Sequence, residues 1–159
     1  MAATLTSKRH RVADPADAIE FCFQQGWTDG LPVIPPTQDR VVTMLEAARL
    51  DAKQEIGFVA HRAVSITAEK VAINAVMAGC KPEYMPVVVA AVEGIADPRW
   101  SYHGPGTSTA GAAVLLIVNG PIARELDVNA GDNLFGPGWR ANLTIGRAVR
   151  LVMRNVCGS

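Results

Sequence analysis

Residues 67–79, TAEKVAINAVMAG, decide the fold of this chain. Thr67 suits the start of a helix, Glu69 lies in its first turn, and Gly79 is a natural stop at its C-terminal end. Between these ends the stretch is apolar nearly all round, so other parts of the protein have to cover most of its circumference. We therefore expect a largely buried helix here.

A second apolar helix is predicted to follow closely. It begins near Pro86 and runs through VVVAAVEGIA to Pro98. Two such helices in succession need more covering surface than a small monomer easily offers. The sequence therefore predicts an oligomer.

Amphipathic helices are predicted on either side of this pair. Asp14 and Pro15 suit the start of one that stops at Gly26, and Thr37 suits the cap of the next. Asn142 is predicted to cap the last helix, which has the sequence LTIGRAVRLVMRNV over residues 143–156.

Strands are predicted in two places. Residues 112–118, AAVLLIV, form a continuous aliphatic run that is typical of a buried strand, and residues 57–65, GFVAHRAVS, indicate a short strand or extended segment. The expected fold is a helix-rich α/β domain over residues 14–159, with a small central sheet around residues 112–118. A flexible arm of residues 1–13 is expected to precede this single domain.

The composition limits the function classes. The 159 residues include 15 basic and 15 acidic side chains, a balance that argues against a nucleic-acid binder or a protein steered to anionic membranes. No apolar run approaches the roughly 18 residues of a membrane span, and the N-terminus lacks the apolar stretch of a secretory signal. The odd number of cysteines, three, indicates thiols in a reducing compartment. We expect a cytoplasmic protein.

Long irregular segments are the places where chemistry is expected. They are GWTDGLPVIPPT (26–37), called the strap below, RWSYHGPGTSTAG (99–111) and NAGDNLFGPGWRAN (129–142). Loops of this length in a compact domain are often functional. We expect the three to converge on one substrate pocket with Trp27 as its apolar wall.

Two residues are the candidate catalytic groups. Cys80 follows the stop at Gly79 and has Lys81 beside it, so it is either a nucleophilic or redox thiol or a small buried hydrophobe in a helix corner. His103 lies in a glycine-rich loop with nearby hydroxyl groups, so it is either a general acid or base or a loop histidine bonded to the backbone.

The candidate substrate contacts are polar groups of the three segments. Arg140 sits in a glycine loop at a helix start and is the preferred anion clamp, because a guanidinium and free amides bind a carboxylate well. Trp27, Asp29, Ser108 and Asn142 complete the predicted set. Arg147, Arg150 and Arg154 form a stripe that is either a solvated face or a docking face for an acidic partner.

No metal site is predicted. His61 and His103 lie 42 positions apart (61 and 103), and the chain contains no HxxxH, HExxH or Cys/His cluster. The glycine-rich loops match neither a P-loop nor a dinucleotide fingerprint, so the sequence identifies no cofactor.

Four blocks of the chain resemble a known family. They are GWTDGLPVIPPT, VAINAVMAGCKPEYMPVVVAAV, IVNGPIARELDVNAG and GPGWRANLTIGRAVRLVMRNV, and they span about residues 26–156. They resemble a family of small bacterial proteins that occur beside, or joined to, proteins with a selenocysteine- or cysteine-Gly-Ser-Cys redox motif. Those redox proteins are themselves similar to components of the glycine reductase type.

The resemblance implies a function. It implies a cytosolic subunit of a heteromeric enzyme that acts on a small molecule by thiol or selenol chemistry of the redox or lyase kind. This chain lacks the motif, so the nucleophile is expected on the partner and part of the pocket on this chain. The alternatives are a self-sufficient homo-oligomeric enzyme using Cys80 or His103, and a non-catalytic scaffold.

Overall fold

The computed structural model describes residues 4–108 and 112–158. Within these ranges it contains seven α-helices and a two-stranded antiparallel sheet, so the predicted helix-rich α/β fold is confirmed. The elements are α1 (Pro15–Gln24), α2 (Gln38–Ala47), β1 (Glu55–Val59), β2 (Val64–Thr67), α3 (Ala68–Ala78), α4 (Met85–Ala96), α5 (His103–Thr107), α6 (Pro121–Glu125) and α7 (Arg140–Asn155).

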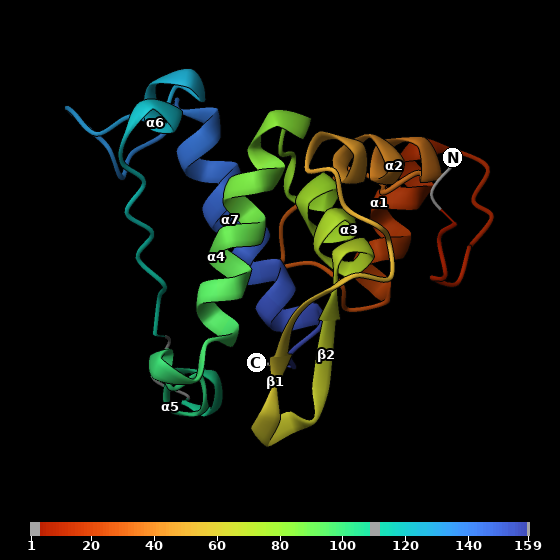
Figure 1. Cartoon of the computed structure of the whole chain (residues 1–159). Coiled ribbons are helices and arrows are strands. Elements are labelled where there is room, and N and C mark those ends of the chain that lie inside the picture. Colours follow the sequence, from red (N-terminus) through yellow and green to blue (C-terminus); the bar gives the residue numbers. More distant parts are fainter. Residues whose placement is uncertain (1–3, 109–111, 159) are drawn as a thin grey trace.

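Helix α3 is the centre of the structure, as its sequence predicts. It follows the N-cap residue Thr67 and ends at Gly79, which adopts the left-handed conformation that favours glycine. Helices α2, α4 and α7 all pack against it, and nine of its eleven residues are buried (Figure 1). Small side chains on α3 let these neighbours approach closely.

Strands β1 and β2 form a hairpin at the end of α4. They pair antiparallel, with Phe58 opposite Ser65 and Val59 opposite Val64. The hairpin lies so close to α4 that a Cβ at Gly57 would collide with the side chain of Ala96. Of the short strand or extended segment predicted over residues 57–65, the two ends are confirmed as strand, but residues 60–62 form a 3-10 turn that reverses the chain between them.

The strand predicted over residues 112–118 is wrong. These residues form no strand, and the sheet of the described residues comprises β1 and β2 alone. The segment runs from the region of α5 to α6 along one side of the molecule (Figure 1). Val114 and Leu116 pack against the core, whereas Leu115 is 67% and Ile117 is 79% exposed. Exposure alternates along the segment as it does in a strand, but no other strand of the described residues lies beside it.

The start of the last helix also differs from its prediction. Trp139 is the N-cap residue of α7, and Asn142 lies inside the first turn. The side chain of Asn142 is turned away to the preceding loop, where it accepts from the backbone N–H of Asn129 at 2.9 Å and donates to two carbonyls. It binds the loop instead of capping the helix.

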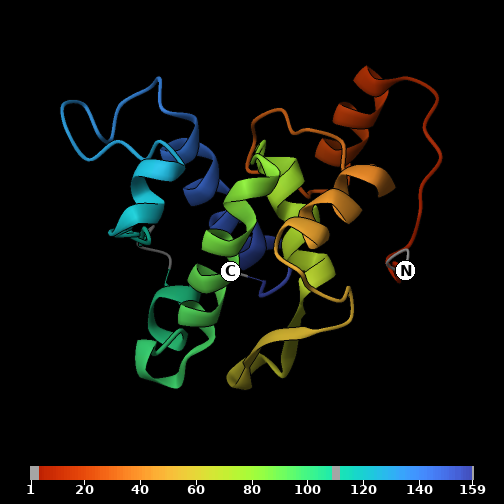
Figure 2. The same ribbon diagram turned by 45° about the horizontal axis from the view of Figure 1, so that its top comes forward.

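The predicted arm, residues 1–13, lies partly outside the described residues. Residues 6 and 7 lie against α3, and from there the arm runs along one side of the molecule to the start of α1 (Figure 2). Thr6 and Ser7 donate hydrogen bonds to the carboxylate of Glu69 on α3. The flexibility of the arm stays a prediction, but these contacts give it one defined position. No described helix has both the length and the apolar character that crossing a bilayer requires.

Candidate functional site

A cleft lies between the arm and the helical core. Its volume is about 660 Å³, and it is lined by the arm, α1, the strap, α2, α3 and the end of α7. Three aromatic rings stand together on its wall: His10 from the arm, Phe21 from α1 and Trp27 from the strap. Their ring centres lie 5.0 to 5.8 Å apart. The cleft therefore offers a flat ligand an aromatic surface.

The polar side of the cleft is formed by α3 and α7. Asn155 donates to the side-chain oxygen of Asn74 at 2.7 Å and to the carbonyl of Trp27 at 2.8 Å. Asn74 is buried, with 3% of its surface exposed, and donates in turn to the carbonyl of Lys70. This chain of amides fixes the strap against the two helices beside the aromatic wall.

Glu69 is the buried carboxylate of the cleft. It is 2% exposed and accepts the backbone N–H of Thr6 at 2.9 Å, that of Ser7 at 2.8 Å and the hydroxyl of Thr6 at 2.7 Å. Burial acts to raise the pKa of this carboxyl, but the hydrogen bonds from Thr6 and Ser7 outweigh it and leave the pKa below the ordinary value. Glu69 is therefore an ionised group that holds the arm.

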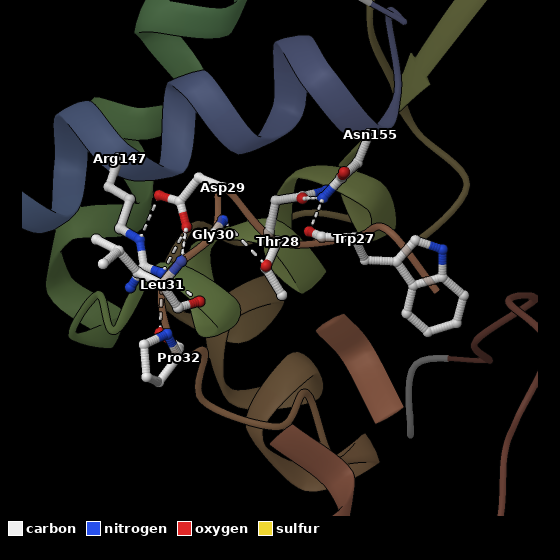
Figure 3. A network of polar contacts seen from close by, with 9 residues as sticks. Trp27, Thr28, Asp29, Gly30, Leu31, Pro32, Arg147 and Asn155 are labelled. Atoms are coloured by element: carbon white, nitrogen blue, oxygen red, sulfur yellow. Dashed lines mark hydrogen bonds and ion pairs between the residues drawn. The ribbon is translucent and has the colours of Figure 1, made fainter. Parts of the chain in front are cut away.

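The strap is fastened along α7 (Figure 3). The guanidinium of Arg147 donates to both carboxylate oxygens of Asp29 at 2.8 Å and to the carbonyl of Pro32 at 2.9 Å. This bidentate hydrogen bond, followed by the charge of Arg147, lowers the pKa of Asp29. Asp29 is thus a structural partner of α7, and Arg147 has its acidic partner within the chain.

Arg140 and Cys80 meet where α3 ends. Arg140 donates two hydrogen bonds to the carbonyl of Gly79, at 2.9 and 3.1 Å, and so binds the C-terminal end of α3. Cys80 is 6% exposed, and its Sγ lies 3.3 Å from the carbonyl of Thr144, to which the thiol donates. Burial raises the pKa of Cys80 to about 11, so at neutral pH it is a protonated thiol. Of the two alternatives for Cys80, these surroundings favour the buried hydrophobe.

His103 and Ser108 lie at the other end of the molecule, on and just after α5. His103 is the first residue of α5, and its ring centre is 5.0 Å from that of His61 in the turn between β1 and β2. The side chains of both histidines are exposed. This pair was invisible in the sequence because a hairpin and a helix bring together residues that no local spacing connects.

The predicted pocket is therefore not formed as one cavity. Of the seven predicted site residues only Trp27 lines the cleft, while Asp29, Cys80, Arg140 and Asn142 make contacts that hold helix ends and loops. Sequence reasoning missed Glu69 as a cleft residue. The sequence did contain an indication of it. Glu69 is an acidic residue in a helix that is apolar nearly all round, and a buried carboxylate requires hydrogen-bond donors.

Within residues 4–108 and 112–158, no group of three or more His, Cys, Asp and Glu side chains is placed to hold a metal ion. Comparisons with protein-family models, with curated proteins and with solved structures found no match to this chain.

Proposed function

We propose that this chain is the small subunit of a heteromeric cytoplasmic enzyme that acts on a small molecule by redox or lyase chemistry at a thiol or selenol. In this proposal the chain supplies part of the substrate pocket. The partner supplies the nucleophile, in the selenocysteine- or cysteine-Gly-Ser-Cys motif that the family resemblance implies.

The observation that carries the subunit role is the exposed segment at residues 112–119. No backbone hydrogen bond is formed by these residues in the described structure, and Leu115 and Ile117 present most of their surface to solvent. An extended apolar stretch with unpaired N–H and C=O groups is a template for pairing with another chain. A subunit interface gives this segment the burial that its composition favours.

The cleft supports the small-molecule part of the proposal. Ligand sites measure roughly 300–1,000 Å³ and are mainly apolar with a few placed polar groups. The cleft beside Trp27 has a volume of about 660 Å³, an aromatic wall and the amides of Asn74 and Asn155. A small planar substrate fits a site of this size and character.

The state of the thiols supports a nucleophile on the partner. Cys22, Cys80 and Cys157 are all buried, and burial raises the pKa of each. A protonated, inaccessible thiol is a poor nucleophile. Thiol chemistry by this enzyme then depends on a residue of the second chain.

The test is the composition of the complex isolated from its own cells. We expect native mass spectrometry to find a second chain with the redox motif. The double variant Leu115→Glu/Ile117→Glu should lose that chain, because charges at the segment oppose its burial. Phe23→Glu is the matched control, since Phe23 is also exposed, at 55%, but lies on α1. A complex made only of copies of this chain, with full turnover, would contradict the proposal.

A self-sufficient homo-oligomeric enzyme is the second candidate. It is favoured by the pairing of His103 with His61, because a histidine beside a second imidazole is suited to proton transfer. This candidate predicts turnover by the chain alone and its loss in His103→Ala. Turnover that survives this substitution eliminates the form of this candidate that uses His103.

A further inference from the structure

We infer that His61 and His103 form a binding site for one borderline divalent metal ion, of the class of Zn²⁺, Ni²⁺ and Cu²⁺. This site lies outside the cleft, and it goes beyond the function proposed above and does not depend on it.

The separation of the two rings matches that of two imidazoles on one ion. With a metal–nitrogen bond of about 2.1 Å, an ion lies roughly 3.2 Å from the centre of each ligating ring. Two rings on a tetrahedral ion then have centres about 5.2 Å apart, and two rings at a right angle on an octahedral ion about 4.5 Å apart. The ring centres of His61 and His103 are 5.0 Å apart, within this interval.

The fold fixes the two backbones that carry the rings. Arg62, next to His61, donates to the carbonyl of Gly106 on α5 at 3.0 Å and to the carbonyl of Gly158 at 2.6 Å. It thereby fastens the hairpin turn to α5 and to the end of the described chain. The ring of Tyr102, next to His103, lies 5.4 Å from the His61 ring between centres. The metal site is thus assembled by contacts that hold the backbone, while both imidazoles stay exposed and accessible.

The charge beside the pair limits the affinity of the site. A histidine ligates a metal through its neutral ring. The positive charge of Arg62 opposes a cation, and we therefore expect weaker binding than at a site with three protein ligands.

The chemistry of the donors selects the metal. Imidazole nitrogen suits Zn²⁺, Cu²⁺ and Ni²⁺ and is a poor ligand for Mg²⁺ or Ca²⁺, which require oxygen. Because no third His, Cys, Asp or Glu of the described residues joins the pair, the other coordination positions belong to water. Such an open site leaves room for a ligand oxygen to bind the ion directly.

The test uses the untagged chain and three single variants. Calorimetric titration with Zn²⁺ should give one ion per chain, with affinity falling by at least about tenfold in His61→Ala and in His103→Ala. His10→Ala is the matched control, because His10 lies on the arm beside Phe21 and should leave the titration unchanged. All three positions are exposed, so these variants are expected to fold.

Electron paramagnetic resonance with Cu²⁺ provides a second readout. The spectrum of the natural sequence should show coupling to two imidazole nitrogens, and that of either variant at position 61 or 103 to one. Three results would overturn the inference: no stoichiometric Zn²⁺ binding, loss in only one of the two variants, or loss in His10→Ala.

Discussion

Helix α3 and the segment at residues 112–119 are both strongly apolar, but they differ in burial and in backbone hydrogen bonding. The helix is enclosed by α2, α4 and α7, and its backbone groups bond to each other. The segment has no backbone hydrogen bond in the described structure and leaves Leu115 and Ile117 exposed. An apolar pattern thus indicates that a stretch has to be buried, but it does not show which chain buries it.

The largest expected effect compares two leucines. Leu151 on α7 is fully buried, whereas Leu115 is 67% exposed. Leu151→Ala should lower the free energy of unfolding by about 2–5 kcal/mol, and Leu115→Ala by less than about 0.5 kcal/mol. Urea unfolding of the isolated chain measures both. Equal losses of stability in the two variants would mean that Leu115 is already buried in the isolated chain. The contrast between the buried helices and the exposed segment would then be wrong.

Glu69 tests whether the arm belongs with the core. Glu69→Gln should lower the free energy of unfolding by about 1–3 kcal/mol at pH 7, because an amide accepts the N–H bonds of Thr6 and Ser7 less well than a carboxylate. Since the pKa of Glu69 is lower in the folded than in the unfolded chain, its contribution is present above the ordinary value of 4.5. It is lost as the pH falls below that value, through the lower folded pKa.

Thr6→Ala, which removes a single hydroxyl donor, is the control for Glu69→Gln, and its loss should be smaller. Unfolding curves recorded from pH 7 down to pH 3 measure both effects. A pH profile of Glu69→Gln that matches that of the natural sequence would show that the carboxylate contributes nothing.

Asp29 tests the fastening of the strap. Asp29→Asn should lower the free energy of unfolding by about 1–2 kcal/mol, because the bidentate bond to Arg147 loses its charge. The pKa of Asp29 is lowered on folding, so this contribution is present above its ordinary value of 3.8 and is lost as the pH falls through the lower folded value. The difference in stability between the variant and the natural sequence should therefore shrink as the pH falls below 3.8.

The smallest expected effect is the absence of a reaction. Cys80 should resist alkylation by iodoacetamide at pH 7 in the folded chain, because it is buried and protonated. A cysteine introduced as Leu115→Cys should react at the rate of an exposed thiol. Mass spectrometry of the labelled peptides separates the two sites. If the introduced thiol is protected only in the complex from cells, the segment is covered there by the partner.

The sequence predicted most of the core because local patterns determine it. Helix α3 begins after Thr67 and ends at Gly79 as expected, and the carboxylate of Asp14 caps α1 by accepting a hydrogen bond from the backbone N–H of Ala16. Helix ends and apolar periodicity are properties of neighbouring residues, so they are readable without a structure. The partner of the segment at residues 112–118 is not a local property, and the strand predicted there was wrong.

The candidate site was less predictable for a related reason. Arg140, Asp29 and Asn142 are polar groups in loops, and the sequence alone does not show whether such a group meets a ligand or another part of the chain. Each of them meets the chain: the carbonyl of Gly79, the guanidinium of Arg147 and the backbone of Asn129. His61 lies in the hairpin and His103 on α5, so their pairing depends on how these two elements pack. No local sequence motif predicts it.

The contact between the strap and α7 has a consequence for how the protein is made. The hydrogen bond from Asn155 to Trp27 joins residues 128 positions apart, and that from Arg147 to Asp29 joins residues 118 apart. Closing such distant contacts is slow compared with forming a helix. Helix α7, residues 140–155, has to be synthesised before it can pack against α3 and complete its burial. Until then the nascent chain exposes an apolar helix that chaperones would recognise.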